Sequence, residues 1–89
     1  MPKRDYKTID EGILATLQPR QLEQLYWMVK GNNGYGVAYE MGLSNKSIPL
    51  RQNAIRYKLG LSKFFNLKII ADRNKEWILK NTIVKGKVK

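Results

Sequence analysis

The chain has 89 residues, 17 lysines and arginines against 7 acidic residues, and a formal net charge of +10. This length indicates one domain, residues 1–89, with a small core. The chain has neither cysteine nor histidine, which excludes disulfides and thiolate metal sites and removes the commonest general base. So large a positive charge favours a polyanionic partner such as a nucleic acid.

Several other classes of protein are disfavoured by the same composition. The first dozen residues lack the apolar core of a signal peptide, and the longest apolar clusters are far too short to span a bilayer. We therefore expect no membrane partner and a cytoplasmic, nucleoid-associated location. The acidic residues are scattered and no glycine-rich phosphate motif follows a strand, so we expect no enzyme activity, no cofactor and no metal site.

The N-terminal segment predicts a flexible end followed by a short helix. Residues 1–7 are basic and polar, and we expect them to form a loose arm. Thr8 and Glu11 fit a capping box, in which each side chain bonds to the backbone of the other residue. This pattern predicts a helix that ends near Thr16. It is an extra N-terminal helix, ahead of a helix-turn-helix core that we place at residues 17–72.

Two further helices follow in the first half of the chain. Pro19 suits the first turn of a helix. Helical spacing places the next apolar residues on one face: Leu22, Leu25, Tyr26 and Val29. The segment 31–34 ends this helix, and Asn33 can cap the next one. The side chains expected to point inward from that helix are Val37, Ala38 and Met41.

The most informative window lies between Glu40 and Asp72, because it contains no acidic residue. Gly42 supplies the left-handed residue that ends a helix, and a tight turn follows. The next helix begins near Ser44, a good N-cap, or at Pro49, which disfavours helical geometry in the preceding residue. One stripe of this helix is apolar and should pack inward: Ile48, Ile55 and Leu59.

The C-terminal third predicts one more helix and a basic tail. Gly60 ends the previous helix, and Ser62 can cap a helix over residues 63–72. Its apolar residues include Phe64, Phe65 and Ile69. These side chains belong either to the core or to a dimer surface, because one short helix cannot bury both faces in a small domain. Residues 76–84 fit a helix or a strand, and residues 85–89 are expected to be a flexible basic end.

Residues 17–71 resemble, without a gap, the LuxR/GerE-type helix-turn-helix domain of bacterial transcription regulators. The family's opening motif appears as Leu17-Gln18-Pro19-Arg20-Gln21-Leu22-Glu23-Gln24-Leu25. Its turn appears as Val37-Ala38-Tyr39-Glu40-Met41-Gly42-Leu43-Ser44. Its reading helix appears as Ser47-Ile48-Pro49-Leu50-Arg51-Gln52-Asn53-Ala54-Ile55-Arg56-Tyr57-Lys58-Leu59-Gly60. The turn and the Lys58-Leu59-Gly60 end are specific in combination, and either alone would be weak.

The resemblance implies an all-α small helical bundle whose third helix, around residues 45–59, reads the major groove. It also implies that the fourth helix pairs two protomers into a homodimer. Arg20 matches a position of the family's opening motif and either buttresses helix packing or touches a phosphate.

Four departures from the family are clear. Arg51 stands at the family's histidine position and Ala54 at its asparagine position. Pro49 stands where the family has a base-reading lysine, and Gly36 replaces an acidic residue. We therefore expect a DNA sequence preference that differs from that of typical members.

The expected DNA contacts comprise Lys46, Pro49, Leu50, Arg51, Asn53, Arg56, Tyr57, Lys58 and Lys63. Arginine can bind guanine through two hydrogen bonds, asparagine can bind adenine in the same way, and leucine can contact a thymine methyl. The lysines suit phosphates, which position a protein without reading sequence. For Lys58 the alternative role is to stabilise the end of its helix. The alternative interpretation of the whole set is that these residues form the solvated face of an ordinary amphipathic helix and contact no DNA.

These features predict a sequence-specific double-stranded DNA-binding transcription regulator. Because the family is usually fused to a sensor or receiver domain, we expect a stand-alone regulator of a bacterium, phage or plasmid. The main alternative is a small basic adaptor that binds RNA polymerase or another regulator through the same helix. Single-stranded RNA is a third possible partner, for which the sequence offers tyrosines for stacking but no module signature.

Overall fold

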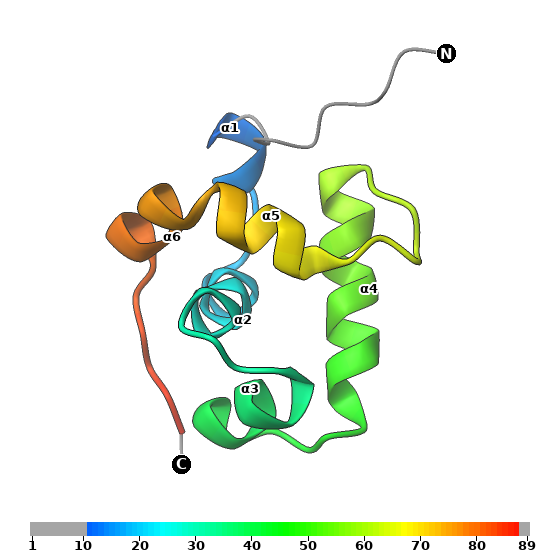
Figure 1. The fold of residues 1–89 in the computed structure, drawn as a ribbon, viewed down its shortest axis with the longest axis vertical. Helices are drawn as coiled ribbons and strands as arrows, with labels where there is room; N and C mark the ends of the chain where they lie inside the picture. The colour runs from blue at the N-terminus through cyan, green and yellow to red at the C-terminus, as the bar shows by residue number, and fades with distance from the viewer. Residues whose placement is uncertain (1–10, 88–89) are drawn as a thin grey trace.

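The computed structural model describes residues 11–87, which form six helices and, within that range, no strand (Figure 1). The helices are α1 (Glu11–Leu14), α2 (Pro19–Val29), α3 (Gly34–Met41), α4 (Ser47–Leu59), α5 (Leu67–Arg73) and α6 (Lys75–Asn81). The predicted all-α bundle is confirmed, including the short helix before residue 17. The predicted arm of residues 1–7 and the capping residue Thr8 lie outside the described residues.

The central element of the bundle is α2, with α3, α5 and α6 packed around it (Figure 1). Pro19 occupies the first position of α2, as expected, and the Gln18 amide donates to Gln21 Oε1 at 2.9 Å. Because neighbours cover α2 on several sides, it buries polar side chains beside its apolar face. The buried residues of α2 are Glu23, Gln24, Leu25 and Met28.

The turn between α3 and α4 is built from local caps. Asn33 Oδ1 accepts a hydrogen bond from the Gly36 amide at 3.0 Å, so the predicted cap of α3 is confirmed. Gly42 ends α3 in the left-handed conformation, with φ of 68°. A Cβ added at Gly42 would lie 3.3 Å from Lys87, so a close neighbour adds to the requirement for glycine.

The start of α4 falls between the two predicted positions. Ser44 Oγ accepts from the Ser47 amide at 3.3 Å, and Ser47 Oγ donates to the Ser44 carbonyl at 2.8 Å. These bonds form a turn, after which α4 begins at Ser47. Pro49 is the third residue of the helix, where the missing N–H would have no intrahelical partner. Proline is therefore compatible with this first turn.

The predicted helix over residues 63–72 is wrong at its start. α5 begins at Leu67, and its N-cap is Asn66, whose side chain accepts from the Lys68 amide at 2.9 Å. The intervening residues 61–66 form a loop. Phe64 and Phe65 lie three and four positions before Leu67 and Ile69, which mimicked helical faces, but Asn66 caps α5 only after them. The segment 76–84, left open between helix and strand, contains most of α6 and then extended chain.

The core contains every residue expected to point inward from α3 and α4. These buried residues are Val37, Ala38, Met41, Ile48, Ile55 and Leu59. α6 also packs against α2 and α5, so the helical unit continues beyond residue 72. Backbone groups of Lys85 and Gly86 bond to α2, while the flexibility expected of residues 85–89 stays a prediction. No helix of residues 11–87 is long and apolar enough to cross a membrane.

Candidate nucleic-acid interface

α4 lies at one edge of the molecule and is held there by its inner face (Figure 1). Ile48, Ile55 and Leu59 project from this helix into the core at helical spacing, and Ile55 has no exposed surface. Gly60 ends the helix with φ of 71°. The core therefore fixes the rotation of α4 about its axis, and this rotation decides which residues face solvent.

The opposite side of α4 is exposed and largely apolar. We call this surface the outer face; it comprises Pro49, Leu50, Asn53, Ala54 and Tyr57. Leu50 is 73% exposed and Tyr57 is 86% exposed. All five belong to the helix predicted to read DNA, and four belong to the predicted contact set. The fifth, Ala54, was not predicted as a DNA contact, and the structure adds it to this face.

The predicted arginines are less exposed than the outer face. Arg51 is half-buried at its edge. Arg56 is also half-buried, and its Nε donates to the Phe65 carbonyl at 2.6 Å. Its Nη1 donates to Asn53 Oδ1 at 2.9 Å. Arg56 therefore ties α4 to the loop of residues 61–66 and orients the Asn53 amide, a role that the sequence did not reveal.

The predicted lysines surround this helix. Lys46 and Lys63 are exposed, and Lys63 Nζ lies 5.3 Å from the centre of the Phe64 ring. Lys58 Nζ donates to the Thr16 carbonyl at 3.3 Å, which links α4 to the turn between α1 and α2. No acidic residue occurs between positions 41 and 71. The charged side chains of this stretch, α4 included, are therefore all cations, as an interface with phosphates requires.

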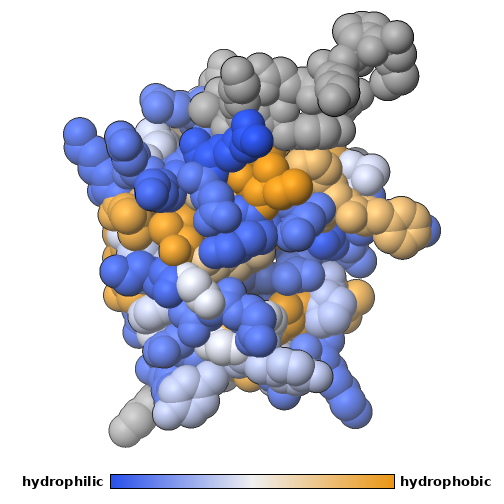
Figure 2. All heavy atoms as spheres, in the orientation of Figure 1, coloured by the Kyte–Doolittle hydropathy of each residue, from blue (hydrophilic) through white to orange (hydrophobic). Residues whose placement is uncertain are grey.

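The residues assigned to dimerisation lie in different environments. Phe64 is 84% exposed in the α4–α5 loop, and apolar atoms project from the same side of the molecule in Figure 2. Phe65 is half-buried and packs against the core, while Ile69 on α5 is 39% exposed. The structure therefore brings the three residues to one region but leaves only Phe64 and Ile69 clearly open to a partner.

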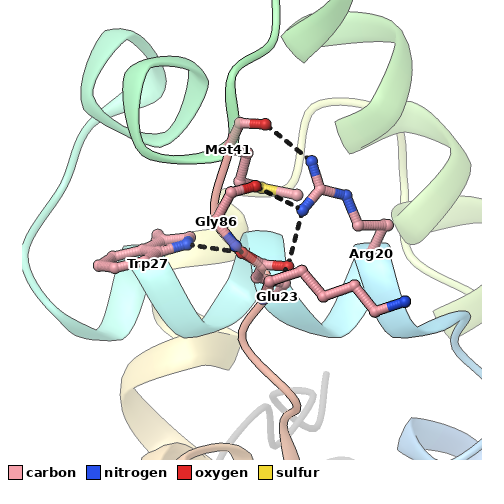
Figure 3. A network of polar contacts seen from close by, with 6 residues as sticks. Arg20, Glu23, Trp27, Met41 and Gly86 are labelled. Carbon is pink, nitrogen blue, oxygen red and sulfur yellow. Dashed lines mark hydrogen bonds and ion pairs between the residues drawn. The ribbon is translucent and has the colours of Figure 1, made fainter. Parts of the chain in front are cut away.

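A second cluster, which the sequence analysis missed, joins α2, the end of α3 and the C-terminal segment (Figure 3). We call it the Glu23 network. The fully buried Glu23 carboxylate accepts from Arg20 Nη1 at 2.8 Å, Trp27 Nε1 at 3.1 Å and the Gly86 amide at 2.7 Å. The Lys85 amide donates to the same carboxylate at 3.2 Å. Four donors from α2 and the C-terminal segment thus converge on one buried charge.

Arg20 extends the Glu23 network to α3. Its Nη1 also donates to the Gly86 carbonyl at 2.9 Å, and its Nη2 donates to the Met41 carbonyl at 2.7 Å (Figure 3). Met41 is the last residue of α3, so Arg20 also supplies a donor to a helix end. Of the two roles left open for Arg20, the structure supports helix packing. The sequence did contain one signal of this network, because Glu23 and Trp27 lie four positions apart and therefore on the same side of α2.

The electrostatics of Glu23 follow from these contacts. Burial raises the pKa of the Glu23 carboxyl, but hydrogen bonds from Trp27, Gly86 and Lys85 and the charge of Arg20 outweigh burial. The net effect lowers the pKa of Glu23 below its ordinary value. A carboxylate that is held ionised by structural donors is a packing element, and nothing in its geometry suggests proton transfer.

Other hollows of the surface offer little chemistry. A cleft between the α2–α3 turn and α5 is lined mainly by glycines and by the amide side chains of Asn32, Asn33, Gln52 and Asn66. Lys68 also lines the cleft, but its Nζ donates to the Met28 carbonyl at 2.6 Å and pairs with Asp72 at 3.2 Å. Within residues 11–87 no group of acidic side chains could hold a metal ion.

Comparison of this chain with protein-family models, with curated proteins and with solved structures finds no significant match. The assignment to the LuxR/GerE type therefore stays a prediction that rests on the residues quoted above. The case for a functional site rests on α4, its outer face and the cations around it.

Proposed function

We propose that this protein binds double-stranded DNA by placing the outer face of α4 in the major groove, and that it regulates transcription in the cytoplasm. One observation carries the proposal. A core-anchored helix presents a protruding outer face within a stretch of 31 residues, positions 41–71, that has six cations and no carboxylate. DNA attracts such a surface through its phosphates and accommodates an α-helix in its major groove.

The roles proposed for individual residues follow from their positions. Lys46 and Lys63 are exposed near the two ends of α4 and suit phosphates on either side of the groove. Asn53 lies on the outer face and suits a base edge. A homodimer that pairs through Phe64 and Ile69 would read two half-sites about one helical turn apart.

The salt dependence of duplex binding tests this function. If about five phosphates are contacted, affinity should fall roughly 500-fold between about 50 and 200 mM salt, because each contact releases condensed counterions. Fluorescence anisotropy with a labelled duplex measures this slope. Lys46→Gln and Lys63→Gln should each lower the slope by about 1, whereas Lys75→Gln and Lys80→Gln on α6 should not. Undetectable duplex binding at low salt would refute the proposal.

A second candidate is favoured by one feature, the large exposure of Leu50 and Tyr57. Exposed apolar side chains on a helix also suit a protein partner, so the adaptor for RNA polymerase or another regulator remains the competing proposal. Co-purification with RNA polymerase from cells treated with nuclease separates the two. The adaptor would be supported if the unmodified protein binds no duplex but stays associated with RNA polymerase after nuclease treatment. The Leu50→Asp variant should then lose this association.

A further inference from the structure

We infer that the outer face of α4 selects A·T-rich major grooves by contacting the 5-methyl groups of thymine. This inference rests on the proposed function and names the DNA that the same surface prefers. It arises from the chemistry of the exposed side chains and from the contacts that hold Arg56 to the Phe65 carbonyl and to Asn53.

The outer face offers mostly hydrocarbon to a base pair. Leu50 is 73% exposed, and Pro49 and Ala54 are exposed beside it. In the major groove the thymine C5-methyl is the one apolar group among the donors and acceptors of the four bases. Burial of Leu50 against this methyl removes apolar surface from water on both partners. Cytosine has only a hydrogen at C5, so the same leucine would lose this methyl contact.

Arg56, one of the two α4 arginines that could read guanine, is engaged elsewhere. Arg56 donates through Nε to the Phe65 carbonyl and through Nη1 to Asn53 Oδ1. Arg51 is half-buried at the edge of the outer face. Asn53 is the polar residue of this face, and Arg56 fixes its amide with the nitrogen as the remaining donor. Asn53 Nδ2 can donate to adenine N7, and Oδ1 keeps a second lone pair for the adenine N6 amino group, so an A·T pair fits at this position.

The spacing of these residues matches successive base pairs. Leu50 and Tyr57 lie seven positions apart on one side of the helix, with Asn53 and Ala54 between them. At 1.5 Å per residue this stripe is about 10 Å long, or about three base pairs at 3.4 Å each. The outer face thus covers a short run of bases, and several methyl groups of an A·T-rich run come within its length.

Charge identifies the occupant of this apolar face as DNA. The chain carries +10, no carboxylate lies between positions 41 and 71, and Lys46 and Lys63 flank the face. These cations have no carboxylate in the same stretch to neutralise them, so a protein partner would need acidic side chains around an apolar surface. The phosphates on both sides of a major groove complement them directly.

The test replaces thymine by uracil, which removes the methyl and keeps the base pairing. The probe is the duplex that binds best in a selection from a random pool, with each thymine replaced in turn. We expect A·T-rich selected duplexes and a loss of about fourfold in affinity for each contacted methyl. Leu50→Ala should bring the thymine-to-uracil ratio close to one at its position. Leu79→Ala, the same change at an exposed leucine of α6, should leave every ratio unchanged.

The outcomes separate the inference from the proposed function. Tight, salt-dependent binding with no effect of uracil would overturn the methyl contact and leave DNA binding intact. Equal uracil losses in the unmodified protein and in Leu50→Ala would also overturn it, since the methyl would then act through duplex shape. Absence of binding to any duplex would overturn both. Thermal unfolding followed by circular dichroism is the control that Leu50→Ala is folded, and the exposed position of Leu50 predicts that it is.

Discussion

The outer face of α4 and the Glu23 network use their side chains in opposite ways. On the outer face Leu50 and Tyr57 extend into solvent, while the apolar stripe of α4 anchors the helix from behind. In the network a buried carboxylate is surrounded by donors from α2 and the C-terminal segment, and Arg20 joins them to the end of α3. The difference teaches that the proposed binding surface can change without loss of the fold, whereas the network that supports the end of α3 cannot.

Removal of the Glu23 carboxylate should produce the largest effect. In Glu23→Ala the Gly86 and Lys85 amides, the Trp27 indole and Arg20 lose a buried acceptor, at a cost of about 4 kcal/mol in the free energy of unfolding. Urea unfolding at neutral pH measures this change. The control, Glu76→Ala in the first turn of α6, should cost about 1 kcal/mol or less. Similar losses in both variants would show that the network has no special weight.

Two apolar truncations on α4 sharpen the contrast between its faces. Ile55→Ala opens a cavity under the helix and should cost about 3 kcal/mol in stability, because Ile55 has no exposed surface. Leu50→Ala should change stability by about 0.5 kcal/mol or less. Both changes in stability are obtained from the shift of the urea midpoint, provided that the dependence of the unfolding free energy on urea concentration is unchanged. A large loss for Leu50→Ala would mean that its side chain is covered in solution, as in a dimer formed through α4.

A change at Gly86 tests whether the C-terminal segment is held by its backbone. Gly86 has φ of +63°, and an added Cβ would meet only the Glu40 carbonyl at an ordinary 3.6 Å. Gly86→Ala should therefore cost about 1–2 kcal/mol through its left-handed backbone alone. Gly86→Asn should cost less, because asparagine tolerates this conformation better. Thermal melts of the two variants give the comparison, and equal losses would argue against backbone strain as the cause.

The smallest expected effect is a dependence of stability on acid. Since folding lowers the pKa of Glu23, the folded state holds fewer protons on this group than the unfolded state does. Its contribution to stability is present above the ordinary glutamate pKa of about 4.3 and is lost as the pH falls toward the lower folded value. The unmodified protein should therefore lose more stability on acidification than Glu23→Gln does. Parallel pH profiles would show that Glu23 is not selectively stabilised as a carboxylate.

Local patterns in the sequence predicted much of the helical fold. Asn33 caps α3, Gly42 and Gly60 end α3 and α4, and Pro19 opens α2, because each acts on backbone within about four residues. The apolar stripe of α4 predicted its inner face, whereas the half-burial of Arg51 and Arg56 and the exposure of Ala54 were found only in the structure. The positions of the charged residues along the sequence located the cationic stretch 41–71 that contains this helix.

Only the tertiary structure decided what depends on distant partners. Glu23 and Gly86 are 63 positions apart, so no local pattern joined them, and the tail looked flexible because it is polar and basic. Phe64 with Leu67, and Phe65 with Ile69, have helical spacing, but Arg56 bonds the Phe65 carbonyl within a loop and Asn66 caps α5 after it. Capping and periodicity act on neighbouring residues, whereas buried charges and loop carbonyls take partners that only the packed chain brings close.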